Sequence, residues 1–532
     1  MGQGLRALRW PRRKRVRWGD ASSGRGRSGV RLQNKAPGAA QGTPESGNAD
    51  TVPQEILSQR LRALSSLRER APGPERGMPP MPQEHVQFLK MTTMPVGKLI
   101  ASLAVPTIVS MLVTSIYNMA DTYFVSQLGT SASGAVGVVF SLMALIQAVG
   151  FTIGMGSGTW ISRLLGARRL DEARTVAASG YYLSLVLGAS LSVGGLLGID
   201  PLMRLLGATD TILPYAKDYA SFILFAAPVM ASSFLLNNIL RAEGKAQFAM
   251  VGITAGGLLN MVLDPIFIFT FKMGIAGAAI ATALSQCVSF ALLLSCFLTR
   301  RTTTSLHLRD LARTPQTYLR IVQNGLPSFC RQGLASVATI ATNVSAAVYG
   351  DAAVAALSIV GKIFMVAFSV LIGIGQGYQP VLGYNYGAGN FDRVRAAFRF
   401  TLEAGTVLMV LGALGGWWGA PALMTWFIAD DPQVVAIGTG NLRAVGLAMP
   451  LVPLMVVCNM TFQSIGKSWT ALFLSAARQG IFFLPLILLM PRFFGLPGLQ
   501  VTQALADLCT FVCCLPFARY FFRDLAAREA AR

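Results

Sequence analysis

The chain has 532 residues, of which 53% are hydrophobic and only 13% are charged. Soluble domains carry about 25% charged residues, so the composition excludes an ordinary soluble protein and indicates an integral membrane protein. The formal net charge of +21 is concentrated in the N-terminal segment and in alternate loops, and we therefore predict no nucleic-acid partner.

Residues 1–90 differ from the rest of the chain. They carry 17 Lys and Arg against 7 Asp and Glu, are rich in Pro, Gly and Ser, and have few large apolar residues. Such a segment cannot bury enough apolar surface to fold. No apolar stretch follows the basic run at residues 10–15, so a secretory signal is not predicted. We expect a disordered basic N-terminal extension.

Twelve apolar stretches lie beyond residue 95, and about 20 apolar residues suffice to cross a bilayer core. They predict an all-α integral membrane protein with twelve transmembrane helices, divided into an N-lobe (91–300), a cytoplasmic inter-lobe loop (301–315) and a C-lobe with a short cytoplasmic tail (316–532). The stretches are 99–125, 136–161, 181–197, 219–240, 250–271, 276–298, 321–347, 353–382, 400–418, 433–461, 469–490 and 496–518.

The second six stretches repeat the first six at an offset of about 221 residues. Pro106 corresponds to Pro327 and Gly129 to Gly350, with further glycine pairs along both halves. In membrane proteins a duplication of this length is typical of two similar helix bundles that rock against each other around a shared site. The repeat therefore predicts a transporter.

Positive charge follows every second stretch. Lys and Arg cluster after the second, fourth, sixth, eighth, tenth and twelfth stretches, whereas the intervening loops carry little net positive charge. Because cytoplasmic loops of membrane proteins carry an excess of Lys and Arg, this pattern places both termini in the cytoplasm.

Two polar groups interrupt the apolar stretches of the first half. Asp121 lies in the first stretch, and Asn260 and Asp264 share one helical face in the fifth, directly before Pro265. A carboxylate at mid-bilayer is costly and should face the protein interior. These oxygen atoms suit Na⁺, and a buried carboxyl suits a proton. The alternatives are an interfacial Asp121 at a helix end and an Asp264 that caps a helix break.

The remaining motifs do not support enzymatic chemistry. The seven cysteines all lie in apolar stretches, and the two histidines, His85 and His307, lie outside them, so neither a catalytic constellation nor a metal-ligand set is present. The Gly154–Gly158 run lacks the rest of a nucleotide-binding motif. Gly150, Gly154 and Gly158 instead form a stripe suited to close helix packing. We predict a non-enzymatic protein without a cofactor, apart from Na⁺ or H⁺ as a coupling ion.

Four segments resemble the multidrug and toxic compound extrusion (MATE) family, in particular its MepA-like bacterial branch. They are 117–129, 154–173, 240–286 and 373–389, the last containing Gly375-Gln376-Gly377-Tyr378-Gln379-Pro380. The resemblance implies two six-helix lobes, cytoplasmic termini, and export of amphipathic, mostly cationic compounds in exchange for Na⁺ or H⁺. It also implies a multi-pass protein of the cell inner (plasma) membrane, whose partners are small-molecule drugs or dyes and the lipid bilayer; we expect a monomer.

The family motifs also imply roles for individual residues. The cation-coupling site would comprise Tyr117, Asp121, Asn260, Asp264 and Thr282, and Pro106 matches a proline associated with helix bending. We further assign three glutamines as candidates for lining a substrate cavity, namely Gln147, Gln376 and Gln379.

Two other classes of membrane protein remain open. A flippase for a lipid-linked precursor would line its cavity with basic residues, and four C-lobe residues keep that alternative open: Arg331, Lys362, Arg443 and Arg478. A channel or receptor is disfavoured by the two-lobe repeat. At the repeat offset Asp121 faces Thr342, Asp264 faces Pro485 and Asn260 faces Ile481, so the proposed coupling site belongs to the first half alone.

Overall fold

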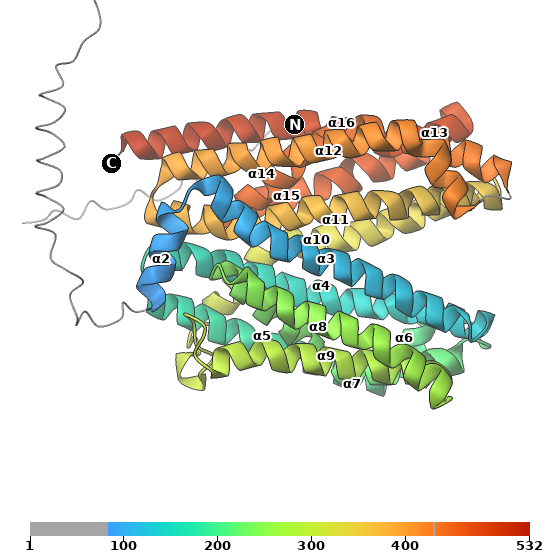
Figure 1. The fold of residues 1–532 in the computed structure, drawn as a ribbon, viewed down its shortest axis with the longest axis horizontal. Helices are drawn as coiled ribbons and strands as arrows, with labels where there is room; N and C mark the ends of the chain where they lie inside the picture. The colour runs from blue at the N-terminus through green and yellow to red at the C-terminus, as the bar shows by residue number, and fades with distance from the viewer. Residues whose placement is uncertain (1–82, 429–430, 532) are drawn as a thin grey trace, which may run out of the picture. The chain divides into compact units, whose positions relative to one another are not determined.

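The structure, a computed structural model, describes residues 83–428 and 431–531, which contain helices and no β-strand (Figure 1). The disorder predicted for residues 1–82 lies outside the described residues. The last part of the predicted extension differs from the expectation, because helix α2 begins at Gln83. Glu84 in its first turn and Lys90 in its last turn suit the helix dipole.

The N-lobe contains the elements α3 to α9 and the C-lobe the elements α10 to α16. The N-lobe helices are α3 (Val96–Ser126), α4 (Thr130–Gly166), α5 (Leu170–Leu197), α6 (Ile199–Leu205), α7 (Leu213–Ala242), α8 (Ala246–Pro265), the π-helix η1 (Ile266–Thr270) and α9 (Gly274–Leu298), and the 3₁₀ turn η2 (Leu308–Asp310) follows in the inter-lobe loop. The C-lobe helices are α10 (Pro315–Ala347), α11 (Asp351–Ala388), α12 (Phe391–Phe427), α13 (Pro432–Ala448), η3 (Met449–Leu451), α14 (Val452–Ser464), α15 (Ser468–Ala476), the π-helix η4 (Ala477–Phe483) and α16 (Leu484–Ala530).

The helices account for twelve spans. Ten segments of the described chain are long and apolar enough to cross a membrane. One of them, Ser468–Ala530, is 63 residues long and contains two spans, because Gly495 breaks the helix with a φ of 61°. The twelfth span is α10. Its polar residues lower its hydropathy below that of the other ten segments, but it packs against α4 and α11 as a member of the bundle. The predicted all-α fold with an internal repeat is confirmed.

The repeat is visible in the backbone as well as in the sequence. Gly129 and Gly350 precede α4 and α11 with φ values of 107° and 92°. The pair Gly274 and Gly495 has φ values of 58° and 61°. Residues with a Cβ rarely adopt such positive φ values, so both halves need glycine at the same turns. This requirement explains why these glycines occur at equivalent places in both halves.

Glycines also form the contact between the lobes. A Cβ on Gly166 would collide with the carbonyl oxygen of Tyr384, and a Cβ on Gly387 would collide with that of Arg163. The two glycines are 221 residues apart, and so are the residues that they contact. The lobes therefore meet in a pseudo-symmetric contact at the carboxyl ends of α4 and α11.

The same contact continues along α3, α4, α10 and α11. A Cβ on Gly377 would lie 2.6 Å from the Ala104 nitrogen, and one on Gly325 would collide with the Thr152 carbonyl oxygen. This end of the molecule also holds α2 and the carboxyl end of α16, where Arg395 pairs with Glu529 (Figure 1). The lobes are thus closed against each other at the end where α2 and the carboxyl end of α16 lie.

Glu243, in the turn between α7 and α8, anchors the inter-lobe loop. Its fully buried carboxylate accepts hydrogen bonds from the backbone nitrogens of Thr303 and Thr304, both at 2.8 Å, and from the Thr304 hydroxyl at 2.6 Å. Lys245 pairs with it at 2.8 Å. Gly244, with a φ of 78°, allows the tight turn between the two charged residues.

Glu243→Gln is expected to destabilise the protein by about 3–5 kcal/mol, because it leaves the half-buried Lys245 ammonium without a charged partner. A lowered apparent Tm of the purified protein in detergent would show this. Glu403→Gln, at an exposed position of α12, is the matched control and should leave the Tm unchanged. Equal Tm values for the two variants would contradict the anchoring role of Glu243.

Helix α2 contacts both lobes. On the N-lobe side the Gln87 amide donates a hydrogen bond of 2.7 Å to the Glu243 backbone carbonyl, and Glu84 pairs with Arg174. On the C-lobe side the Asn385 amide donates to the Met91 carbonyl at 3.1 Å. The Arg393 guanidinium donates to the carbonyl of Met94, just beyond the helix, at 2.6 Å. The helix therefore links the two lobes at their closed end.

Candidate functional site

A large cavity lies between the lobes, beyond the glycine contacts. Its volume is about 890 Å³, a size that suits a drug-sized molecule. On α3 the residues lining it begin at Met111, just past the contact at Ala104, and on α10 they begin at Ser328, just past Gly325. The cavity is therefore closed off at the α2 end by the inter-lobe contact, as expected for one state of an alternating-access transporter.

The N-lobe wall of the cavity carries a polar cluster. The Asn260 amide of α8 donates hydrogen bonds to Asp264 Oδ1 at 3.0 Å and to Thr282 Oγ1 of α9 at 3.2 Å. Asn260 and Thr282 line the cavity, whereas Asp264 lies behind them with no exposed surface. The i, i+4 spacing on α8 thus places the carboxyl group one layer beneath the wall.

Asp121 of α3 belongs to the same region. It interacts electrostatically with Asp264 and with Tyr117, and Tyr117 packs on α8 at Gly257. Helix α3 continues to Ser126, so Asp121 does not end it. Asp264 does not cap a helix break either, since the chain continues through Pro265 into the π-helix η1. Among the described residues, only Asn260 donates a hydrogen bond to its side chain. The structure therefore brings the five residues assigned to the coupling site into one region.

Several oxygen atoms of this cluster lack partners. Asp121 Oδ1, Asn260 Oδ1 and Asp264 Oδ2 are buried and accept no hydrogen bond within the described residues. Buried polar atoms are normally paired, and each exception needs an explanation. Unpaired carboxylate and amide oxygens are the kind of ligands that a hard cation prefers, and a proton on either carboxyl would also satisfy an oxygen. Their role as ion ligands stays a prediction.

Two further residues belong to this cluster and were missed from the sequence. Tyr219 of α7 is fully buried, its hydroxyl lies next to Thr282, and both Asp121 and Asp264 act on it electrostatically. Ser285 of α9, one turn after Thr282, has a buried hydroxyl without a hydrogen-bond partner among the described residues. Tyr219 opens an apolar stretch directly after Lys217 and Asp218, so the sequence suggested a residue at a helix end and not a member of this cluster.

In the equivalent part of the C-lobe, the carboxylate is paired with an arginine. Arg478 of η4 binds Asp507 of α16 through two hydrogen bonds of 2.7 and 3.1 Å, and Gln503 donates a third to the same carboxylate. Asp507 is the C-lobe carboxylate that the sequence analysis missed. Because its charge is already matched, it offers no free oxygen comparable to those of Asp121 and Asp264.

The MatE family model matches two stretches of the chain, residues 106–266 and 327–489. The stretches begin 221 residues apart and together cover more than half of the chain, one in each lobe. The chain belongs to the MatE family. Its members are the MATE transporters, and the multi-pass helical architecture of this chain agrees with that assignment.

Individual MATE proteins are similar along most of their length. The chain is 26% identical over 411 residues to the multidrug export protein MepA of Staphylococcus haemolyticus, covering 77% of this chain and 90% of MepA. It is 25% identical to MepA of Staphylococcus aureus strain MRSA252, covering 81% of this chain and 95% of that MepA. The resemblance to the MepA-like branch is confirmed.

Solved MATE structures share the fold. A MATE crystallised in complex with MaL6 is 27% identical and superposes with a TM-score of 0.79, covering 84% of this chain and 99% of that chain. An outward-facing multidrug resistance transporter of the MATE family is 28% identical, with a TM-score of 0.78 over 84% of this chain and 98% of that chain. The likeness therefore extends over both lobes.

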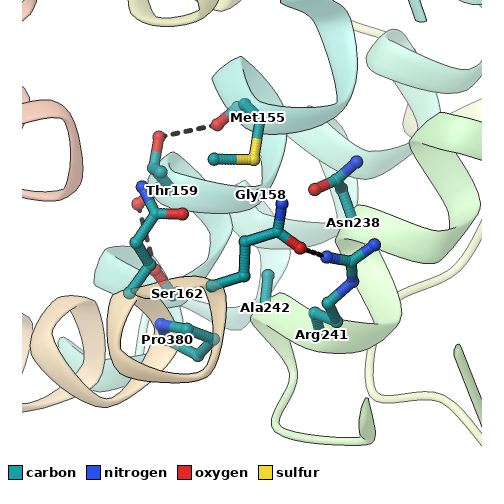
Figure 2. A pocket seen from close by; sticks show the side chains of 10 residues that line it. Met155, Gly158, Thr159, Ser162, Asn238, Arg241, Ala242 and Pro380 are labelled. Atoms are coloured by element: carbon teal, nitrogen blue, oxygen red, sulfur yellow. Dashed lines mark hydrogen bonds between the residues drawn. The ribbon is translucent and has the colours of Figure 1, made fainter. Parts of the chain in front are cut away.

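The floor of the MATE cavity is a buried network between the lobes. Arg241 of α7 hydrogen-bonds through its guanidinium to Gln376 of α11 and to Asn237, so one side chain joins the N-lobe to the C-lobe. Figure 2 shows Arg241 directed into a small pocket of about 20 Å³, also bordered by Thr159 and Ser162. That volume has room for about one water molecule.

The predicted cavity residues divide between these two spaces. Gln147 and Gln376 line the large cavity. Gln376 also borders the small pocket, whereas Gln379 borders the small pocket alone and bonds to Gln463 of α14 at 3.3 Å, because it lies nearly one turn further along α11 towards the closed end. Pro106 lies buried within α3, between the contacts of Ala104 and Ile108 with α11. Its role in helix bending stays a prediction.

Proposed function

We propose that this MATE-family protein is a Na⁺- or H⁺-coupled antiporter that exports amphipathic compounds, including the cationic ones that the family resemblance implies, across the plasma membrane. The observation that supports coupling is the set of unpaired oxygens on Asp121, Asn260 and Asp264, directly behind the N-lobe wall of the cavity. The MepA proteins to which the chain is similar are multidrug export proteins. The proposal includes cytoplasmic termini and a monomeric transporter.

The proposed cycle links ion binding to the N-lobe wall. With cytoplasmic termini, the contact at the α2 end is the cytoplasmic gate and the cavity belongs to an outward state. An ion at Asp121 and Asp264 would pull α3 and α8 together, because it satisfies oxygens from both helices. Asn260 and Thr282 would then shift at the cavity surface and weaken the hold on the exported compound. Return without the compound resets the inward state.

Efflux from proteoliposomes tests this proposal. The purified protein is reconstituted with a fluorescent amphipathic dye, and Na⁺ and H⁺ gradients are imposed separately. We expect uphill dye movement under one of the two gradients and its loss when that gradient is collapsed. A membrane potential of 100 mV supplies about 2.3 kcal/mol for each charge that moves, which suffices for measurable accumulation of the dye. Dye movement that only dissipates its own gradient, as in a channel, would contradict the proposal.

A further inference from the structure

The cavity wall carries positive charge and no matching negative charge. Four cationic side chains line it, namely Arg241, Arg331, Lys362 and Arg478, and no Asp or Glu of the described residues lines it. The C-lobe cations named from the sequence thus face the cavity, except Arg443. That residue lies over the Trp417 ring, 5.7 Å from its centre, and is not part of the lining.

The four cations differ in what surrounds them. Arg478 is matched by Asp507, and Arg241 bonds to two neutral amides at the floor. Arg331 of α10 and Lys362 of α11 form no hydrogen bond or ion pair within residues 83–428 and 431–531. Arg331 is half-buried and Lys362 is exposed to the cavity. A half-buried guanidinium without an anion is costly and attracts one from a ligand.

Aromatic side chains line the same cavity, and the guanidinium of Arg478 lies over two of them, Phe364 and Phe368. Phe364 and Phe368 of α11 stack with ring centres 5.7 Å apart, and both line the cavity. On the opposite wall Phe151 and Phe234 form a second aromatic pair with centres 5.0 Å apart. The carboxyl group of Asp264 lies behind that opposite wall. The cavity is therefore positive on its C-lobe side, with aromatic surface on both sides for the body of an amphipathic molecule.

We propose that the C-lobe wall of the cavity binds the carboxylate of amphipathic organic anions and zwitterions, with Arg331 and Lys362 as its ligands. The planar guanidinium matches a carboxylate through two parallel hydrogen bonds, and the ammonium adds a second charge. The inference rests on the proposed export function and places compounds that carry a carboxylate among the exported ones. A purely cationic compound would meet the unmatched charges of Arg331 and Lys362.

Rhodamine B and its ethyl ester test this assignment, because they share one ring system and differ in a free carboxylate. Binding to the full-length protein in nanodiscs is measured by fluorescence anisotropy. We expect rhodamine B to bind about tenfold more tightly than the ester, the effect of one charged hydrogen bond. Arg331→Gln combined with Lys362→Gln should abolish the preference, by weakening the binding of rhodamine B and strengthening that of the cationic ester, and the retained ester binding shows that the variant is folded. Arg443→Gln is the matched control and should keep the preference.

Equal or tighter binding of the ester, or a preference that survives the double substitution, would overturn the inference. Competition distinguishes the source of the anion. If farnesyl pyrophosphate displaces rhodamine B better than farnesoic acid does, the site would be assigned to a lipid-linked phosphate instead of a carboxylate. Efflux is scored separately. A binding preference without gradient-driven efflux of either dye would contradict the proposed function and leave the carboxylate site standing. Uphill efflux of the dyes without a binding preference would support the proposed function and contradict the carboxylate site.

Discussion

Asp264→Asn is expected to abolish gradient-driven efflux while leaving the protein folded and able to bind its substrate. The amide is isosteric with the carboxyl group and can still accept the hydrogen bond from Asn260, so local packing is kept. It cannot carry the charge that a coupled ion requires. At a potential of 100 mV, losing one coupled charge removes about 2.3 kcal/mol of driving force. The substrate gradient that the transporter maintains should fall by about 50-fold.

The measurement compares efflux from proteoliposomes with substrate affinity for the same preparation. Asp121→Asn should behave in the same way, because its Oδ1 belongs to the same unpaired set. Asp507→Asn provides the contrast in the C-lobe: it leaves Arg478 unmatched and should lower the Tm, but efflux per folded molecule should still follow the ion gradient. Undiminished gradient-driven efflux in both Asp121→Asn and Asp264→Asn would rule out the assigned coupling site.

The second large effect is expected from a single methyl group at the inter-lobe contact. In Gly325→Ala the new Cβ would collide with the Thr152 carbonyl oxygen, and main-chain atoms cannot turn aside as a side chain can. Overpacking of this kind costs about 1–3 kcal/mol. The cost applies only when the lobes are closed at this end, so the balance between the two transport states should shift by about 5- to 150-fold. Transport should slow because the cavity would no longer close at the α2 end.

Gly333→Ala is the matched control on the same helix. No atom lies within 4 Å of the Cβ that it would add. Both substitutions gain the same helix propensity, about 0.5–1 kcal/mol, so their difference isolates the contact with Thr152. State populations are measured by modification of a cysteine introduced at the inter-lobe contact, and transport by dye efflux. Equal transport in the two variants would show that the lobes tolerate extra volume at Gly325.

The features that the sequence predicted well are those fixed by local chemistry. Gly129 and Gly350 recur because their turns need positive φ. Such a requirement restricts the residue type at these positions whatever the tertiary structure. The Asn260 and Asp264 pair was recognisable for the same reason, since a four-residue spacing determines a shared helix face. The two-lobe fold and the region of the candidate site were predicted from these local patterns.

What escaped prediction depends on how each helix is rotated in the bundle. Gln376 and Gln379 lie three residues apart and both border the small pocket, yet only Gln376 also reaches the large cavity. Asp507 was overlooked because its partner Arg478 is 29 residues away, beyond the break at Gly495. Tyr219 joins the acidic cluster only through the packing of α7. No pattern along one helix reports such pairings.

The first turns of helix α2 make its contacts with the N-lobe, and its end makes those with the C-lobe. A chain that began at Met91 would keep every membrane span and both hydrogen bonds from the C-lobe, those of Asn385 and Arg393. It would lack Gln87, and with it the bond to Glu243 on the N-lobe. The residues before Met91 therefore hold the N-lobe side of the closed end, and their loss should favour the state in which the lobes separate there.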